Sequence, residues 1–166
     1  MTVRNLNFMF NPSAVALVGA SQKPGSIGAV LARNLVSAGF KGEIFPVNPK
    51  YKTIEGLPAY PDVNSLPEAP DLAVIATPPD SVPELIAEFG KRGTRAAVVI
   101  TAGFGEGGSE KGEKLCAQMR DSARLHLLRI VGPNCLGIMV PGVGLNASFG
   151  HVQPLRGNIA FVAQSG

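Results

Sequence analysis

The chain has 166 residues, of which 45% are hydrophobic and 16% are charged, and its formal net charge is +3. This length favours one domain with a substantial core, the composition argues against disorder, and no apolar run approaches the roughly 20 residues of a membrane helix. Basic and acidic residues are interspersed, which argues against a nucleic-acid partner, and without a secretory signal or metal-ligand spacing of Cys116 and Cys135 we expect a cytoplasmic protein.

Short apolar runs recur along the chain and predict β-strands. The first, AVALVG at 14–19, is rich in valine and ends at a glycine, which is typical of a strand buried on both faces. Runs of the same character follow at 43–48, 71–77, 95–101 and 125–132, and GNIAFVAQSG at 157–166 is a sixth candidate.

Helical patterns separate these runs. One apolar stripe begins at Ile27 and ends at Gly39, a second extends from Val82 to Phe89 before Gly90 and Gly93, and a third starts near Ser109. The alternation predicts an α/β, Rossmann-like, doubly wound and mostly parallel sheet with helices on both faces. Residues 51–70 contain four prolines and predict a surface connection, with a short helical possibility at 63–66.

The loops that leave the strands are the expected ligand positions, because parallel α/β sheets bind ligands at the carboxyl ends of their strands. The first loop, from Gly19 to Gly28, offers glycines, backbone N–H groups and Ser26 as a helix cap. These features favour a small anion at the helix N-terminus, although a tight turn without any ligand has the same pattern.

The second strand ends in Asn48, Pro49 and Lys50, where an NAD site usually has an acidic residue. A lysine here suits an additional phosphate on the ribose, either the 2′-phosphate of NADP or the 3′-phosphate of coenzyme A. Lys52 is a second candidate for this position, and the alternative for either lysine is solvated surface charge.

The remaining loops contain small and polar residues but no catalytic set. Asp80 or Ser81 is a candidate cap for the second helix. The structural interpretation of Cys135 is a small buried hydrophobic residue. His126 is expected inside a buried strand and His151 in a loop, so neither is placed to activate the thiol. We therefore predict no catalytic residue and no metal site.

Six motifs together resemble a known family: VALVGAS with GSIG, FPVNPKY, DLAVIATPP, VVITAGFGE, IVGPNCLGI and GNIAFVAQSG. They are similar to the N-terminal coenzyme A-binding domain of acyl-CoA synthetases that form a nucleoside diphosphate. Relatives of that domain include the succinyl-CoA synthetase α subunit and protein acetyltransferases fused to a GNAT domain. The resemblance covers nearly the whole chain.

The resemblance implies that coenzyme A, or an acyl-CoA, lies over the strand ends, with its 3′-phosphate near Lys50 and its thiol near Cys135. In this family, ATP, magnesium and a relay histidine belong to a following synthetase domain and an ATP-grasp domain, which would be the partners of this chain. The expected cofactor-binding residues are Gly19, Ser21, Gly25, Ser26, Ile27, Asn48, Lys50, Thr77, Pro78, Pro79, Thr101, Ala102, Gly103, Asn134 and Cys135.

The expected organisation is a coenzyme A-binding domain at 1–150, followed at 151–166 by a linker and the first strand of the next domain. We expect the isolated chain to bind but not to catalyse. The sequence leaves two alternatives open, an NADP-binding reductase-type domain and a purely structural element. It does not distinguish a synthetase from an acetyltransferase as the parent protein.

Overall fold

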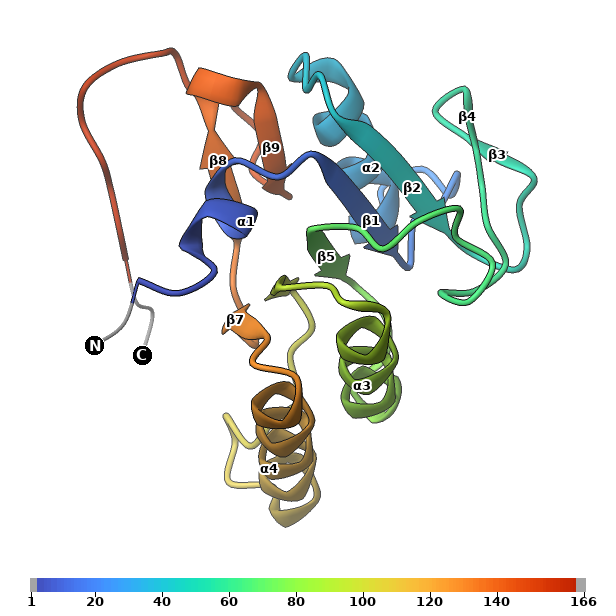
Figure 1. Cartoon of the computed structure of the whole chain (residues 1–166), viewed down its shortest axis with the longest axis vertical. Coiled ribbons are helices and arrows are strands. Elements are labelled where there is room, and N and C mark those ends of the chain that lie inside the picture. Colours follow the sequence, from blue (N-terminus) through green and yellow to red (C-terminus); the bar gives the residue numbers. More distant parts are fainter. Residues whose placement is uncertain (1–2, 164–166) are drawn as a thin grey trace.

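A five-stranded parallel sheet forms the centre of the computed structural model, which describes residues 3–163 (Figure 1). The strand order is β2-β1-β5-β6-β7, and every neighbouring pair is parallel. The order reverses between β1 and β5, as in doubly wound folds, so the predicted fold class is confirmed. The strands are β1 (Ala14–Val18), β2 (Glu43–Val47), β5 (Leu72–Ile75), β6 (Ala96–Val99) and β7 (Arg129–Val131).

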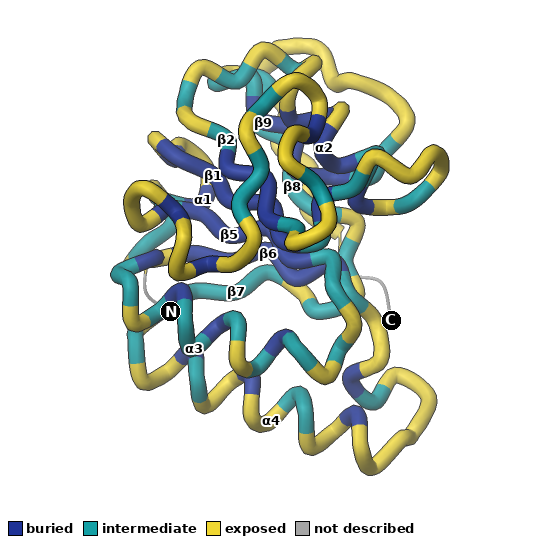
Figure 2. Tube along the Cα trace, turned by 90° about the vertical axis from the view of Figure 1, so that its right-hand side faces the viewer, coloured by how far each residue is buried: buried dark blue, intermediate teal, exposed yellow. Residues whose placement is uncertain are grey.

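Helices and a hairpin cover the two faces of the sheet. Side chains alternate along a strand, so Ala16 faces one core and Leu17 the other. The first face packs against α3 (Val82–Arg92) and α4 (Glu110–Leu125). The second packs against α1 (Leu6–Phe10), α2 (Ile27–Ser37) and the antiparallel hairpin of β8 (Gly137–Val140) and β9 (Leu145–Ser148). Figure 2 shows the buried strands between these two layers.

The starts of α2 and α4 and the ends of α2 and α3 follow predicted residues. Ser26 caps α2 by accepting a hydrogen bond from the Ala29 amide, and Ser109 caps α4 in the same way through Gly112. Helix α2 ends just before Gly39, and α3 ends at Gly93, both of which have positive φ. Helix α3 continues through Gly90, which was expected to end it.

The segment at 125–132 differs from its prediction. Helix α4 extends to Leu125, His126 caps its C-terminus, and only Arg129–Val131 form a strand. The apolar residues Leu125, Leu127 and Leu128 resemble a buried strand in sequence, but Leu125 and Leu127 are exposed. The expectation that His126 lies in a buried strand is therefore wrong. His126 instead packs against Gly90, where any Cβ would collide with its ring.

Three further expectations need correction. Residues 157–163 form no strand and are exposed, because no neighbouring strand pairs with them, while 164–166 lie outside the described residues. Residues 63–66 form no helix, although Val63 and Leu66 are buried beneath α3. The hairpin at 137–148 was not predicted, nor were α1, the short strands β3 (Thr53–Ile54) and β4 (Leu57–Pro58), or the 3-10 turns Pro79–Ser81 and Pro141–Val143.

Candidate functional site

A cavity of about 620 Å³ lies at the carboxyl end of the sheet, beside the point where the strand order reverses. Its volume falls within the range of about 300–1,000 Å³ usual for small-molecule sites. Seven predicted site residues line it, contributed by α2 and by the segments after β5, β6 and β7. The lining residues are Ile27, Ala76, Thr77, Pro78, Ile100, Thr101, Ala102, Asn134, Cys135, Leu136 and Phe149.

Close glycine packing brings the start of α2 to this cavity. Gly19 has φ 87°, and a Cβ there would lie 2.6 Å from the Ala76 carbonyl oxygen. A Cβ at Gly28 would overlap the Gly19 carbonyl oxygen. The first amides of a helix have no partner within it, and those of Ile27 and Gly28 donate to no group in the described part of the chain. They offer donors to an anion.

The loop after β2 is attached to the loop after β1. The Asn48 side chain donates to the Ala20 carbonyl oxygen at 2.7 Å and accepts from the Lys50 amide at 2.9 Å. Lys50 and Lys52 are exposed, and neither forms an ion pair among residues 3–163. Asn48 therefore fixes the backbone from which the Lys50 ammonium extends.

A second cavity of about 210 Å³ adjoins these loops, and Thr77 lines both cavities. It includes Gly19 and Asn48 from the predicted site. It also contains Asp62 and Glu88, and partial burial, assisted by the nearby Glu84 carboxylate, raises the pKa of the Glu88 carboxyl. Predicted residues thus line a larger cavity near α2 and a smaller one near β2, whereas Lys50 lines neither of them.

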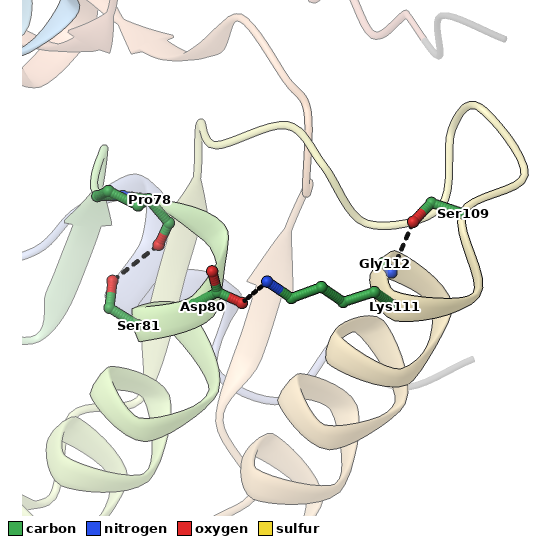
Figure 3. A network of polar contacts seen from close by, with 6 residues as sticks. All are labelled: Pro78, Asp80, Ser81, Ser109, Lys111 and Gly112. Atoms are coloured by element: carbon green, nitrogen blue, oxygen red, sulfur yellow. Dashed lines mark hydrogen bonds and ion pairs between the residues drawn. The ribbon is translucent and has the colours of Figure 1, made fainter.

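Hydrogen bonds connect the loops after β5, β6 and β7. The Thr101 hydroxyl donates to the Thr77 carbonyl oxygen at 2.7 Å, and the backbone N–H of Asn134 donates to the Thr101 carbonyl oxygen at 2.9 Å. The Ser81 hydroxyl lies 2.8 Å from the Thr77 hydroxyl. It also lies 2.8 Å from the Pro78 carbonyl oxygen (Figure 3). These contacts fix the relative positions of three walls of the larger cavity.

Neither predicted cap of α3 has that role. Ser81 is at the N-cap position, but its hydroxyl contacts Thr77 and Pro78 and makes no capping bond. Asp80 forms an ion pair with Lys111 of α4 at 2.7 Å, which links the starts of the two helices (Figure 3). Ser81 ends the 3-10 turn Pro79–Ser81 with helical backbone angles, φ −86° and ψ −16°, whereas a capping residue usually has an extended backbone.

The Gly-rich loop after β6 is closed by one of its own side chains. The Glu106 carboxylate accepts hydrogen bonds from the Gly103 and Phe104 amides at 3.0 and 2.7 Å. Hydrogen bonds from backbone amides, first its own and then those of Phe104 and Gly103, lower the pKa of the Glu106 carboxyl. Gly103 packs beside Pro79, and neither residue lines the two cavities described here, although Thr101 and Ala102 line the larger one.

Cys135 lies in the larger cavity as a neutral thiol. Its Sγ donates to the Val99 carbonyl oxygen at 3.3 Å, and burial raises the pKa of the Cys135 thiol. Asn134 beside it is exposed and has φ 52°. His126 packs against Gly90 and His151 is exposed, so neither histidine lines this cavity. The arrangement favours ligand binding over nucleophilic catalysis.

The remaining predicted residues lie in the first loop. Ser21 accepts from the Lys23 amide at 3.0 Å, and Ser26 accepts from Ala29 and donates to the Lys23 carbonyl oxygen. Gly25 is exposed with φ 75°. Ser21, Gly25 and Ser26 surround the start of α2 but do not line either cavity.

The apolar wall of the larger cavity was not predicted from the sequence, and it is formed by Ala76, Ile100, Leu136 and Phe149. Ala76 and Ile100 lie at the carboxyl ends of the strands predicted at 71–77 and 95–101, so their place at the strand ends was available as a signal. Leu136 and Phe149 adjoin the unpredicted hairpin, and apolar residues there have no distinguishing pattern. Across residues 3–163, no group of three or more potential metal ligands occurs and no helix is long and apolar enough to cross a membrane.

The sequence model of the CoA binding domain family matches residues 13–141 of this chain. The chain belongs to this family. The match includes every strand of the main sheet and the loops after β1, β2, β5 and β6. It confirms the resemblance found in the sequence motifs and favours coenzyme A over the NADP alternative.

Individual relatives agree with the family match. The chain is 41% identical over 161 residues to an ADP-forming acetate–CoA ligase of Methanocaldococcus jannaschii, and 40% identical over 166 residues to the α subunit of ADP-forming acetate–CoA ligase I of Pyrococcus furiosus. These matches cover 97% and 98% of this chain but only 22% and 36% of the relatives. The chain therefore corresponds to a small part of much longer proteins.

A solved structure has the same fold. The chain is similar to acetyl-coenzyme A synthetase 1 of Candidatus Korarchaeum cryptofilum, described as dinucleotide forming and in complex with phosphate and ADP. The similarity has a TM-score of 0.85 and 44% identity, and covers 92% of this chain and 32% of that one. The Rossmann-like sheet is thus the architecture of a synthetase domain.

Proposed function

We propose that this chain is the coenzyme A-holding domain of an ADP-forming acyl-CoA synthetase, and that the cavity beside α2 is where the ligand lies. The observation that carries this proposal is the overlap of the family match with the cavity, because every lining residue except Phe149 lies within the matched residues 13–141. Three of the longer relatives are CoA ligases that form ADP, which supports the parent activity.

The proposed ligand has three parts with different chemistry. The diphosphate meets the amides of Ile27 and Gly28 at the start of α2, where the helix dipole favours an anion. The 3′-phosphate meets the Lys50 ammonium, since Asn48 holds that loop beside the first one. The pantetheine extends along the larger cavity toward Cys135, Leu136 and Phe149.

The protein's part in this function is to bind and orient. The Cys135 thiol remains protonated at neutral pH, and neither histidine lines the larger cavity. Acyl transfer from an acid and ATP requires a phosphorylated intermediate and a nucleotide site, which the proposal assigns to following domains. We propose that residues 151–166 link to such a domain, because the apolar side chains of Leu155, Ile159 and Phe161 are exposed.

Calorimetric titration of the chain with coenzyme A and with NADPH tests the ligand. Binding of coenzyme A with little or no affinity for NADPH is expected, and the reverse order of affinities would refute the proposal. A chain that binds neither ligand would favour the purely structural alternative.

The same chain tests whether it only binds the ligand or also catalyses a step. We expect no acetyl-CoA when it is incubated with coenzyme A, ATP, magnesium and acetate, and no label retained from γ-labelled ATP. Stable labelling that is lost on His126→Ala or His151→Ala would show that this segment catalyses a step itself.

A further inference from the structure

We propose that Asn34, in the middle of α2, is a positioning residue that holds Phe149 as a wall of the larger cavity. Through Phe149 it sets the affinity for the pantetheine part of coenzyme A. The inference rests on the proposed function, which places pantetheine in that cavity.

The contacts of Asn34 surround Phe149 in the chain. The Asn34 Nδ2 group donates to the carbonyl oxygen of Ser148 at 2.8 Å and to that of Gly150 at 3.0 Å. These two residues lie immediately before and after Phe149, which lines the cavity. One side-chain amide therefore holds the backbone on both sides of the cavity residue.

Because Asn34 is buried, loss of these hydrogen bonds would be costly. Only 9% of the residue is exposed, and its neighbours Leu31 and Leu35 are fully buried. A buried amide stabilises a structure when both its hydrogens are donated, whereas removing it leaves two carbonyl oxygens without a partner. The segment at 148–150 would then have to move to satisfy them.

Helix α2 connects this anchor to the start of the site. Ile27 lines the same cavity, and Asn34 follows it by seven residues, which is about two helical turns and places both on one side of the helix. A single rigid element thus contributes one cavity residue directly and holds another through Asn34.

Other hydrogen bonds connect residues 146–150 to one another, so these residues can move together when the Asn34 contacts are lost. The Ser148 hydroxyl donates to the Asn146 side chain at 2.7 Å and accepts from the Gly150 amide at 3.2 Å. The Phe149 amide donates to the Leu136 carbonyl oxygen at 3.3 Å. Leu136 also lines the cavity, so a displacement of Phe149 changes two lining residues together.

The decisive comparison uses two ligands that share adenosine, the 3′-phosphate and the first 5′-phosphate, and that differ in the phosphopantetheine arm. Coenzyme A and adenosine 3′,5′-bisphosphate are titrated into the wild-type chain and into Asn34→Leu, which keeps the size of the side chain and removes its donors. We expect coenzyme A to bind about tenfold more weakly and the bisphosphate to change by less than about twofold, as for loss of one buried polar anchor.

A double-mutant cycle then tests whether Asn34 acts through Phe149. Phe149→Ala alone should weaken coenzyme A, and adding Asn34→Leu to it should cause little further loss, because the residue being positioned is gone. Met119→Ala is the matched control, since Met119 is buried on α4 at the opposite face of the sheet. It should lower stability without a preference between the two ligands.

Several outcomes would overturn the inference. An equal loss for both ligands in Asn34→Leu, or fully additive effects with Phe149→Ala, would make Asn34 only a structural residue. If Asn34→Leu does not fold, Asn34→Ser is used for the same pair of ligands and the same cycle. A wild-type chain that fails to bind coenzyme A would instead refute the proposed function.

Discussion

Two glycine-rich loops leave the same edge of the sheet, the first at 19–26 after β1 and the second at 101–109 after β6. Both lead into helices capped by serine, Ser26 in one and Ser109 in the other. Both also approach their helix so closely that a Cβ on its second or third residue would collide with the loop backbone, at Gly28 and at Gly112.

The difference lies in what the amides of each loop contact. In the second loop, the Gly103 and Phe104 amides already donate to the Glu106 carboxylate, which acts as an internal anion. In the first loop, no acidic side chain accepts from a backbone amide within the described residues, where the Lys23 amide donates to the Ser21 hydroxyl and the Ser26 amide to the Lys23 carbonyl oxygen. A glycine-rich loop before a helix therefore indicates an anion site only when the chain does not supply the anion itself.

The largest expected effect comes from Gly28→Ala, compared with Gly112→Ala in the second loop. The new Cβ at Gly28 overlaps the Gly19 carbonyl oxygen, so the start of α2 must move away from the site. Loss of two charge-assisted amide contacts costs about 3–6 kcal/mol, which weakens coenzyme A by roughly 150-fold or more. Titration calorimetry measures this loss.

Gly112→Ala is the control for this change. Its Cβ would meet the backbone of Gly105 at 2.4 Å, so a comparable loss of stability is expected in thermal unfolding. Its affinity for coenzyme A should remain close to that of the wild type. Equal losses of affinity in the two variants would contradict the expectation that only the first loop contacts the ligand.

The second effect concerns the charge beside the first loop. Lys50→Ala removes the cation expected at the 3′-phosphate, a contact of about 1–3 kcal/mol at an exposed site, and should weaken coenzyme A by roughly 5- to 150-fold. Dephospho-coenzyme A, which lacks that phosphate, should bind almost unchanged. Calorimetry with both ligands measures the difference.

Lys52→Ala provides the matched control, because Lys52 is also exposed and lies two residues away. If only Lys52→Ala discriminates between the two ligands, the phosphate contact belongs to Lys52. If Lys50→Ala weakens both ligands equally, Lys50 does not contact this phosphate.

The fold was predictable from sequence because its signals are local and periodic. Valine-rich runs such as 14–19 and 71–77 can be buried on both faces, and the stripe starting at Ile27 defines a helix. The hairpin at 137–148 was not predicted because GIMV and LNAS lack a clean alternation of apolar and polar residues, and because their burial depends on α2. The error at 125–132 arose because exposed leucines resemble buried ones in sequence.

The candidate site was predictable in its loops but not in its walls. Topology alone places the loops after parallel strands at one edge, so Thr77, Thr101 and Asn134 come together as expected. Phe149 lies between Ser148 and Gly150, whose carbonyl oxygens accept from Asn34 more than 110 positions earlier in the chain, and no local pattern encodes these contacts. The closure of the second loop by Glu106 likewise depends on backbone geometry that its glycines permit.

A smaller effect is expected from Glu106→Gln, which removes the internal anion of the second loop. Backbone hydrogen bonds hold the pKa of the Glu106 carboxyl below its ordinary value of about 4.3. Its stabilisation is therefore complete above that ordinary value and is lost as pH falls through the lowered one. Because the carboxylate is almost fully exposed, we expect less than about 1 kcal/mol at pH 7.

Urea unfolding at pH 7 and again below pH 4 measures this contribution. The difference between the wild type and Glu106→Gln should shrink as the pH falls, and coenzyme A affinity at pH 7 should be the same for both proteins. A carboxyl with a lowered pKa loses its stabilising effect as the pH falls. If acidification instead stabilised the wild type relative to the variant, the prediction would be wrong. Weaker coenzyme A binding in the variant would show that the second loop takes part in the site.

The smallest effect is expected at the ion pair between Lys111 and Asp80, which joins the second loop's helix to the turn after β5 (Figure 3). The atoms lie 2.7 Å apart, but the side chains are 70% and 61% exposed, so water and salt screen their attraction. Lys111→Ala should lower stability by about 0.2–1 kcal/mol in low salt and by less in 1 M NaCl, where the Debye length is about 3 Å. Asp80→Asn should give the same loss, and the double variant should add little to either one. Additive losses would show that the two side chains stabilise the protein separately, and a loss that persists in 1 M NaCl would point to packing of the Lys111 stem over the helix as its source.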